Sequence, residues 1–213
     1  MIKKKFCLVG IDPDFEDLIA ENSRYYVGFF TSIKNKSYKN RNKKLGKENL
    51  KDWKKIKKRF DPEVYIPISM GHVRESLYKK IYKKNYSNLI FKNSYISNSS
   101  KKFLKNKKGI IIQRFVKIMP DVKIYNGVNI NINCQIHHGS TIGKFATLGP
   151  ASVILGNVKI GKHSYIGANA TIKQNIKIGN HCIVGAGSVV IRDVKDYEVV
   201  AGNPSKLIRR NVF

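Results

Sequence analysis

An aliphatic side chain returns at every sixth position from Ile112 to Val190 without a break. A small or β-branched residue stands two positions before nearly all of them. This period matches neither the turn of an α-helix nor the alternation of a simple hairpin, so each hexad is expected to be a short strand followed by a turn. The series therefore predicts a β-solenoid. The aliphatic positions are Ile112, Ile118, Ile124, Ile130, Ile136, Ile142, Leu148, Ile154, Ile160, Ile166, Ile172, Ile178, Val184 and Val190.

The side chains of each hexad divide between the inside and the outside of the coil. Alternation along a strand points the aliphatic residue and the small residue before it to the same side, toward the solenoid axis. Glycine often follows the aliphatic residue, where the turn needs either a positive φ or a closely packed backbone. Three hexads close one triangular coil, so residues eighteen apart stack, and the series makes about four to five coils. A β-sandwich is not expected to keep this register over so many strands.

The chain before the solenoid alternates between strand and helix patterns, which predicts a small parallel sheet with crossover helices. We expect strands at 5–11, 24–31, 63–69 and 88–91, and helices at 12–22, 50–60 and 71–84. The predicted domains are therefore residues 1–108 and 109–213. Ligands bind beyond the carboxyl ends of such strands. Of a GxGxxG fingerprint only Gly10 is present after the first strand, so classical NAD binding is not expected.

The charge of the chain is strongly positive and unevenly distributed. The formal net charge is +27, and residues 1–108 hold 28 Lys and Arg against 10 Asp and Glu. Such a charge attracts polyanions, but no nucleic-acid-binding signature accompanies it, so we interpret it as a solvated lysine surface. Anionic substrates benefit from this field in either case.

Compartment and redox state follow from the apolar runs and the cysteines. No run approaches the ~18 apolar residues of a membrane span, and the apolar stretch 6–11 is too short for a signal peptide. A cytoplasmic protein is therefore expected. Cys7, Cys134 and Cys182 lack CxxC spacing, and we interpret Cys134 and Cys182 as reduced residues facing into the solenoid.

Three runs of the solenoid resemble the hexapeptide-repeat sugar acetyltransferases. They are Asn-Ile-Asn-Cys-Gln-Ile-His-His-Gly-Ser-Thr-Ile-Gly-Lys-Phe at 131–145, Gly-Asn-Val-Lys-Ile-Gly at 156–161 and Val-Ala-Gly-Asn-Pro-Ser-Lys at 200–206. The chain is most similar to the group of sialic acid O-acetyltransferases and N-acetyltransferases of nucleotide-linked 4-amino sugars. This resemblance implies a small Rossmann-like α/β unit at 1–108 that binds the sugar substrate, followed by a left-handed parallel β-helix at 109–213 that binds acetyl-CoA and carries the catalytic residues. It also implies a homotrimer that binds acetyl-CoA between subunits.

The resemblance places the general base at His138. A histidine suits this task because its ordinary pKa of about 6.5 lets it take a proton at neutral pH. Gly156 lies eighteen residues further on, where its missing side chain leaves room for the acetyl group and its N–H could stabilise an oxyanion. Ala168 and Ala186 match the family's backbone contacts to CoA, and together with Pro150 they form one stack at eighteen-residue spacing.

Several positions differ from the residues that the family has there, and others are candidates for binding the cofactor or the substrate. Gly139 and Thr147 stand where the family has an acidic residue that orients the base and a second, cofactor-contacting histidine. Asp121, one coil below Gly139, is our candidate to orient His138 in place of that acid. Thr147 stays a cofactor-binding candidate, and Asn131 and Gly71 are substrate-binding candidates. Thr31 and Ser32 replace acidic residues that are common in nucleotide-sugar members.

His163 and His181 are eighteen apart and could suggest a metal site. A zinc ion needs a further ligand, and Phe145 is the third member of the stack, so we expect a ladder of rings at one turn and no metal. The predicted function is acetyl-CoA-dependent N-acetylation of a nucleotide-linked amino sugar. The alternatives are O-acetylation of sialic acid or another surface-glycan sugar, and a non-catalytic trimeric scaffold or polyanion binder.

Overall fold

The computed structural model describes residues 4–9, 15–30, 44–46, 50–80 and 86–211. They form two compact units, one made of residues 1–68 and 73–87 and one made of residues 69–72 and 88–213. No helix in the described ranges is long and apolar enough to span a bilayer. The expectations for Gly10, Thr31 and Ser32, and for the end of the helix at 71–84, lie outside the described residues.

The N-terminal unit contains the expected parallel sheet, in the order β3-β2-β1-β4. The inner strand β1 is fully buried. Its Phe6 ring packs between Tyr26 and Tyr65 at centroid distances of 5.3 and 5.8 Å. Trp53, which is 3% exposed, anchors α2 in the core. The elements are β1 (Phe6–Val9), α1 (Glu16–Glu21), η2 (Ser23–Tyr25), β2 (Tyr26–Phe30), β3 (Lys44–Gly46), α2 (Leu50–Phe60), β4 (Glu63–Tyr65) and α3 (Gly71–Lys80).

One expected strand of this sheet belongs elsewhere. The strand at 88–91 is present as β5 (Leu89–Ile90), but it pairs with β7 (Ile111–Ile112) of the solenoid. The fourth strand of the N-terminal sheet is instead β3, in a segment rich in lysine and asparagine that carries no strand pattern. The prediction for 88–91 was wrong because a short apolar run does not show which sheet it joins.

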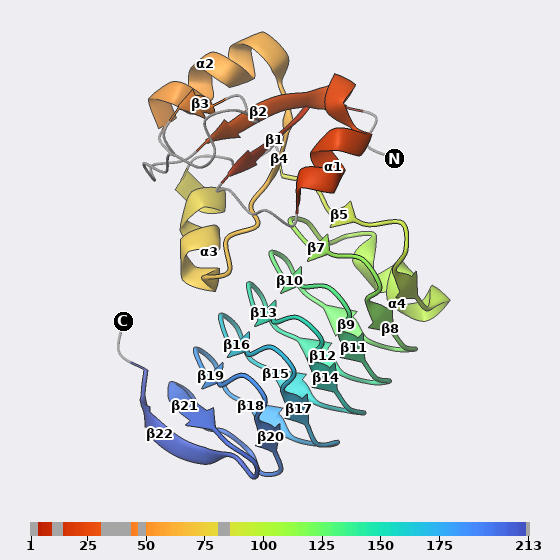
Figure 1. The fold of residues 1–213 in the computed structure, drawn as a ribbon, viewed down its shortest axis with the longest axis vertical. Coiled ribbons are helices and arrows are strands. Elements are labelled where there is room, and N and C mark those ends of the chain that lie inside the picture. The colour runs from red at the N-terminus through yellow and green to blue at the C-terminus, as the bar shows by residue number, and fades with distance from the viewer. Residues whose placement is uncertain (1–3, 10–14, 31–43, 47–49, 81–85, 212–213) are drawn as a thin grey trace. The chain divides into compact units, whose positions relative to one another are not determined.

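The second unit is a parallel β-helix with three faces, and its strands form the regular staircase seen in Figure 1. Neighbouring coils pair at a spacing of eighteen residues, as with Gln135 and Val153, which confirms the predicted stacking. Face 1 holds β5, β7, β10 (Asn129–Ile130), β13 (Thr147–Leu148), β16 (Tyr165–Ile166), β19 (Ile183–Val184), β21 (Glu198–Ala201) and β22 (Lys206–Arg210). Face 2 holds β6 (Tyr95–Ile96), β8 (Lys117–Ile118), β11 (Gln135–Ile136), β14 (Val153–Ile154), β17 (Thr171–Ile172) and β20 (Val189–Val190). Face 3 holds β9 (Lys123–Ile124), β12 (Thr141–Ile142), β15 (Lys159–Ile160) and β18 (Lys177–Ile178).

The solenoid core consists of the predicted aliphatic and small residues. Ile136, Ile154 and Ile172 stack through face 2 with no exposed surface. The small inward serines keep their hydroxyls satisfied, because Ser140 Oγ donates to the Leu155 carbonyl at 2.9 Å and Ser164 Oγ to that of Gly179 at 2.7 Å. A buried hydroxyl without such a partner would destabilise the fold.

In the turns, the positive φ and the close backbone packing occur at different positions, which the sequence alone did not distinguish. A positive φ occurs three residues after the aliphatic position, as at Phe145 (φ 57°) and Asn157 (φ 59°). The glycines directly after the aliphatic residues serve close packing instead. A Cβ on Gly143, for example, would lie 2.7 Å from the Ile160 carbonyl oxygen of the next coil.

The solenoid begins about one coil earlier than the predicted boundary at residue 109. Its unit starts at residue 88, and Tyr95 pairs with Lys117 across 22 residues. The extra length comes from α4 (Asn98–Leu104), which packs on β9 in the place of a strand of face 3. Ser100 Oγ continues the backbone ladder there, since it donates to the Met119 carbonyl and accepts from the Val122 N–H. This helix interrupts the six-residue pattern, so the first coil could not be recognised from that pattern.

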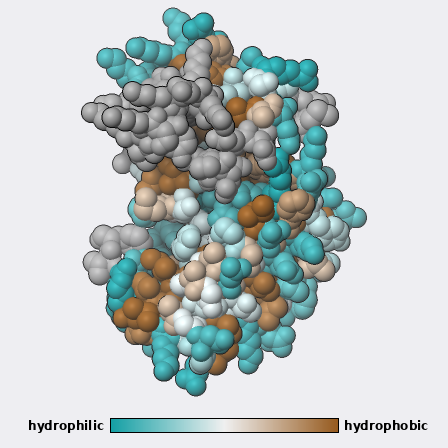
Figure 2. Space-filling view, viewed as in Figure 1, coloured by the Kyte–Doolittle hydropathy of each residue, from teal (hydrophilic) through white to brown (hydrophobic). Residues whose placement is uncertain are grey.

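The C-terminal end of the solenoid is covered by the antiparallel pair β21 and β22. Every residue of β22 is exposed, including Leu207 at 56% and Ile208 at 62%. On the side of the molecule drawn in Figure 2, the hydrophobic side chains of the solenoid lie in small groups between hydrophilic ones.

All three cysteines are free thiols and buried. Burial raises the pKa of each of them, and that of Cys134 to about 11. Because the thiolate is the reactive form, iodoacetamide at pH 8 should leave the native protein almost unmodified and alkylate all three thiols in denaturant. Mass spectrometry of the two samples measures this difference. Rapid alkylation of Cys134 in the native protein would show that its coil opens.

Candidate active site

His138 occupies the corner between β11 on face 2 and β12 on face 3. Its carbonyl accepts from the Asn157 N–H at 2.9 Å, and the N–H of Gly139 donates to the Pro120 carbonyl at 3.1 Å. The backbone of this corner is therefore held by the coil above and the coil below. The His138 side chain is exposed, so its imidazole is accessible to a substrate.

Gly156 lies directly over this imidazole, as the eighteen-residue spacing predicted. A Cβ on Gly156 would be 2.7 Å from His138 Nε2 and 2.8 Å from Cε1. The Gly156 carbonyl accepts from the Asn175 N–H at 2.9 Å, whereas the Gly156 N–H donates to no group in the described part of the chain. This corner thus combines a base with a backbone donor, which are the two groups that acyl transfer requires.

The space at Gly139 is filled from the coil above. A Cβ on Gly139 would overlap Asn157 Oδ1, and Asn157 Nδ2 donates to Asn175 Oδ1 at 3.3 Å. Asp121 is exposed, and its backbone N–H donates to Ser99 Oγ at 2.9 Å. Within the described ranges its carboxylate has no hydrogen-bond partner, so the expected pairing with His138 is not seen. The sequence interpretation missed Asn157, although it stands eighteen residues after Gly139.

The cofactor candidates Ala168 and Ala186 stack at a different corner, between faces 1 and 2. Gly149 and Gly167 allow this close stacking, because a Cβ on Gly149 would lie 2.7 Å from the Ala168 nitrogen and one on Gly167 2.5 Å from that of Ala186. Neither alanine N–H donates to another group in the segments that the structure covers. Asn131 belongs to the same corner and is partly exposed.

Thr147 and Gly71 lie at a third place, around face 1 and its corner with face 3. Thr147 is 1% exposed, and its hydroxyl donates to the Ser69 carbonyl at 2.7 Å. Gly71 is buried against the backbone of Phe145. The predicted role of Thr147 at the cofactor stays a prediction, while its hydroxyl proton already has an acceptor within the chain.

The structure therefore distributes the candidate residues over three corners of the triangle. His138, Gly156 and Asp121 share one corner, Asn131 shares the second with the two alanines, and Gly71 and Thr147 belong to the third. One copy of the chain brings together His138 and Gly156, the candidates for base and oxyanion donor. It does not bring the corner of the cofactor candidates to them.

The middle coils of the solenoid match a known family of repeats. The family model "Bacterial transferase hexapeptide (six repeats)" matches residues 139–174 and 157–192. The coils in this range therefore match the repeat that this model describes.

Solved structures resemble the whole chain, including the part outside the hexapeptide repeats. PerB from Caulobacter crescentus in complex with CoA and GDP-perosamine has a TM-score of 0.84 at 21% identity, over 98% of this chain and 99% of that chain. The acetyltransferase domain of PglB from Neisseria gonorrhoeae in complex with acetyl coenzyme A has a TM-score of 0.81 at 20% identity, over 96% and 99%. WeeI from Acinetobacter baumannii has a TM-score of 0.70 at 22% identity, over 96% and 99%. The predicted fold, a Rossmann-like unit followed by a left-handed β-helix, is confirmed.

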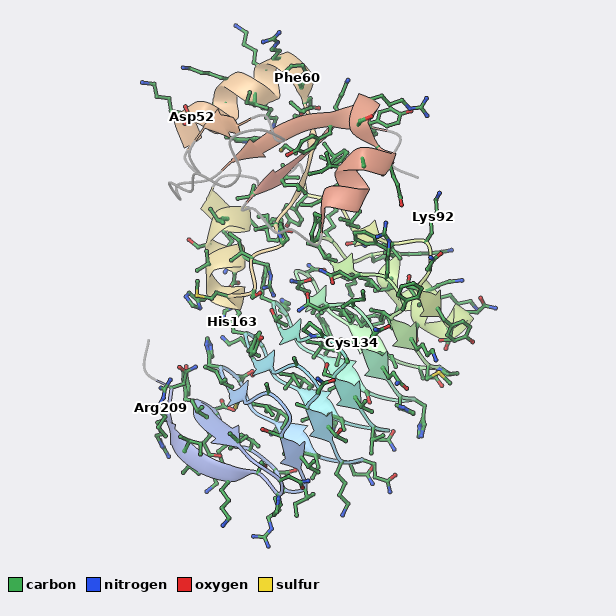
Figure 3. All side chains as sticks on the ribbon, viewed as in Figure 1. Asp52, Phe60, Lys92, Cys134, His163 and Arg209 are labelled. Atoms are coloured by element: carbon green, nitrogen blue, oxygen red, sulfur yellow. The ribbon has the colours of Figure 1, made fainter. Side chains whose placement is uncertain are left out.

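One corner of the hexapeptide repeats carries the predicted ladder of rings. Phe145 and His163 have centroids 5.9 Å apart, and His163 and His181 4.7 Å. Tyr197, which the sequence interpretation missed, continues the ladder by stacking on His181 at 4.9 Å. His163 is labelled at this edge of the solenoid in Figure 3. In the described ranges, no group of three or more His, Cys, Asp or Glu residues is placed to hold a metal ion.

Proposed function

We propose that this chain is an acetyl-CoA-dependent acetyltransferase that acylates the amine of a nucleotide-linked amino sugar. The observation that carries the proposal is the position of the His138 imidazole beneath Gly156, whose N–H has no acceptor in the described part of the chain. The fold supports it, because similar structures hold CoA with GDP-perosamine or acetyl coenzyme A.

The reaction follows from these two groups. The amine nitrogen attacks the thioester carbon while His138 Nε2 takes a proton from it, which contributes a rate factor of roughly 10²–10⁴. The carbonyl oxygen becomes negative and accepts a hydrogen bond from the Gly156 N–H. When the intermediate collapses, the C–S bond breaks, the sulfur leaves as CoA thiol with the proton held by His138, and the sugar keeps the acetyl group as an amide.

The separate corners favour a homotrimer as the working form. In this arrangement the base corner of one subunit faces the cofactor corner of the next, with acetyl-CoA between them. Ala168 and Ala186 would then offer their backbone N–H groups to the pantetheine arm. The threefold axis of such a trimer would repeat this pairing of corners at each of the three subunit boundaries, which gives three equivalent sites. The cytoplasmic location remains a prediction from the sequence.

Release of free CoA thiol in the presence of different acceptors tests the proposed function. The acceptors are GDP-, UDP- and dTDP-linked amino sugars, free sialic acid and neutral sugars, and mass spectrometry identifies the product. An amide on a nucleotide-linked amino sugar supports the proposal. An acetyl ester on sialic acid would point to the O-acetyltransferase alternative. No turnover on any sugar, together with salt-sensitive binding to nucleic acid, would point to the polyanion binder.

Gly156→Ala tests the base corner. The added methyl group would lie 2.7 Å from His138 Nε2, so the imidazole must move from its position. A displacement of this size in the base is expected to lower kcat about 100-fold. Steady-state kinetics with saturating acetyl-CoA measures the effect. The control is Gln174→Ala, an exposed residue one coil further at the same corner, which should keep wild-type kcat. An unchanged kcat in Gly156→Ala would remove this corner from the mechanism.

A further inference from the structure

A four-residue segment from the N-terminal half of the chain belongs structurally to the solenoid. Ser69–His72, here called the crossover segment, groups with residues 88–213, although the residues directly before and after it belong to the N-terminal unit. The chain thus leaves the N-terminal unit at Ile68, touches the solenoid, and returns at Val73. The segment is therefore joined by peptide bonds to the N-terminal unit at both of its ends.

The first contact is a hydrogen bond between residues 78 positions apart. Thr147 Oγ1 donates to the Ser69 carbonyl at 2.7 Å, and Thr147 is 1% exposed. Thr147 stands at an outward position of β13, where Asn129 and Tyr165 are its partners in the neighbouring coils. Within the described ranges neither Asn129 nor Tyr165 hydrogen-bonds to the crossover segment, so Thr147 is the side-chain donor to it among these three.

The second contact packs backbone on backbone. A Cβ on Gly71 would overlap the Phe145 carbonyl oxygen and lie 3.2 Å from His163 Cα. Such an overlap with main-chain atoms cannot be relieved by rotating a side chain. Gly71 is also the first residue of α3. The close contact therefore lies at the first residue of this helix.

The surface beneath Gly71 is itself well fixed. Phe145 has φ 57°, and its ring fills the space that a side chain on Gly127 would occupy. The ring also contacts His163, the next member of the ladder. Gly71 of the crossover segment consequently packs on the backbone of Phe145, whose own ring packs against Gly127 in the coil before and His163 in the coil after.

We infer that Thr147 is a positioning residue, which holds the crossover segment on face 1 through its hydroxyl and does not contact acetyl-CoA. The inference rests on the proposed function. The segment is continuous in sequence at both ends with the N-terminal unit, which is predicted to bind the sugar, so loosening it is expected to affect the kinetics of the amino sugar. The resemblance to the acetyltransferase family predicts a cofactor contact at Thr147 instead, and the two roles differ in the substrate whose kinetics they affect.

Thr147→Val removes the donor and keeps the shape, and Thr147→Ser restores the donor. The matched control is Thr171→Val on β17, whose residue is partly exposed and outward on face 2. Hydrogen exchange followed by mass spectrometry on peptides covering residues 66–76 measures the hold on the crossover segment without any need for activity. Exchange there should be about tenfold faster in Thr147→Val and in Gly71→Ala, and close to wild type in Thr147→Ser and Thr171→Val.

Kinetics supplies the second measurement. In Thr147→Val, kcat/KM for the amino sugar should fall about tenfold, while KM for acetyl-CoA stays unchanged. Thr147→Ser should restore kcat/KM for the amino sugar. Unchanged exchange in Thr147→Val would overturn the inference, as would a rise in KM for acetyl-CoA with the sugar kinetics unaffected. If the wild-type protein acetylates no sugar, the proposed function fails, and the exchange measurement still decides whether Thr147 holds the segment.

Discussion

Replacing His138 with glutamine is expected to lower kcat for acetyl transfer roughly 10²–10⁴-fold. Glutamine keeps a polar side chain of similar reach but cannot take the proton from the attacking amine. Because His138 is exposed at a corner that its backbone hydrogen bonds hold, the fold should be unaffected. Single-turnover rates with pre-bound acetyl-CoA measure the chemical step separately from substrate binding.

His137→Gln is the matched control for this prediction. His137 is the preceding residue, and its backbone N–H donates to the Ile154 carbonyl at 2.8 Å. A Cβ on Gly156 would approach the ring of His138, whereas His137 is not among its nearest neighbours. His137→Gln should therefore retain wild-type kcat. Equal losses in the two variants would mean that the general base lies outside this corner.

Replacing Ile154 with alanine is expected to lower the free energy of unfolding by about 2–5 kcal/mol. Ile154 has no exposed surface and stacks between Ile136 and Ile172. Deleting most of its side chain leaves a cavity that two neighbouring coils both border, and a regular solenoid has little freedom to collapse into it. Urea denaturation at one fixed protein concentration measures the change, since association would otherwise contribute.

Ile191→Ala provides the comparison. Ile191 follows the last aliphatic hexad position, but it is 41% exposed. Its replacement should change the free energy of unfolding by no more than about 0.5 kcal/mol. A similar loss of stability in both variants would contradict the view that the inward column, and not the outer surface, stabilises the coils.

The sequence predicted the solenoid well because its core repeats locally. Each hexad carries its own strand, turn and inward residue, so the register of β11 on β14 follows from spacing alone. The same spacing placed Gly156 over His138. The pattern failed where α4 replaces a strand, because a helix in that place adds residues without an aliphatic marker at the sixth position. This insertion concealed β6 and the pairing of β5 with the solenoid, and it is the reason why the boundary was predicted about one coil too late.

The remaining misses concern contacts without a local signal. Ser69 and Thr147 are 78 residues apart, and neither residue type signals such a pair. Asn157 could have been found, since it stacks on Gly139 at the same spacing that located Gly156. Asp121 in the coil below was the candidate because a carboxylate can accept a hydrogen bond from an imidazole N–H, but the space beside Gly139 is filled by Asn157 from the coil above.

The stacking in multiples of eighteen also limits how this protein can change in length. Loss of one complete coil would shorten the solenoid and leave every later residue at its own corner. Loss of a single hexad between 139 and 155 would keep all aliphatic residues inside, so the product would still fold. It would, however, rotate the rest of the solenoid by one third of a turn, and Gly156 would no longer cover His138. Insertions and deletions of six residues between these two positions are therefore tolerable for the core and damaging for the site, whereas a gain or loss of eighteen residues outside 138–156 preserves both.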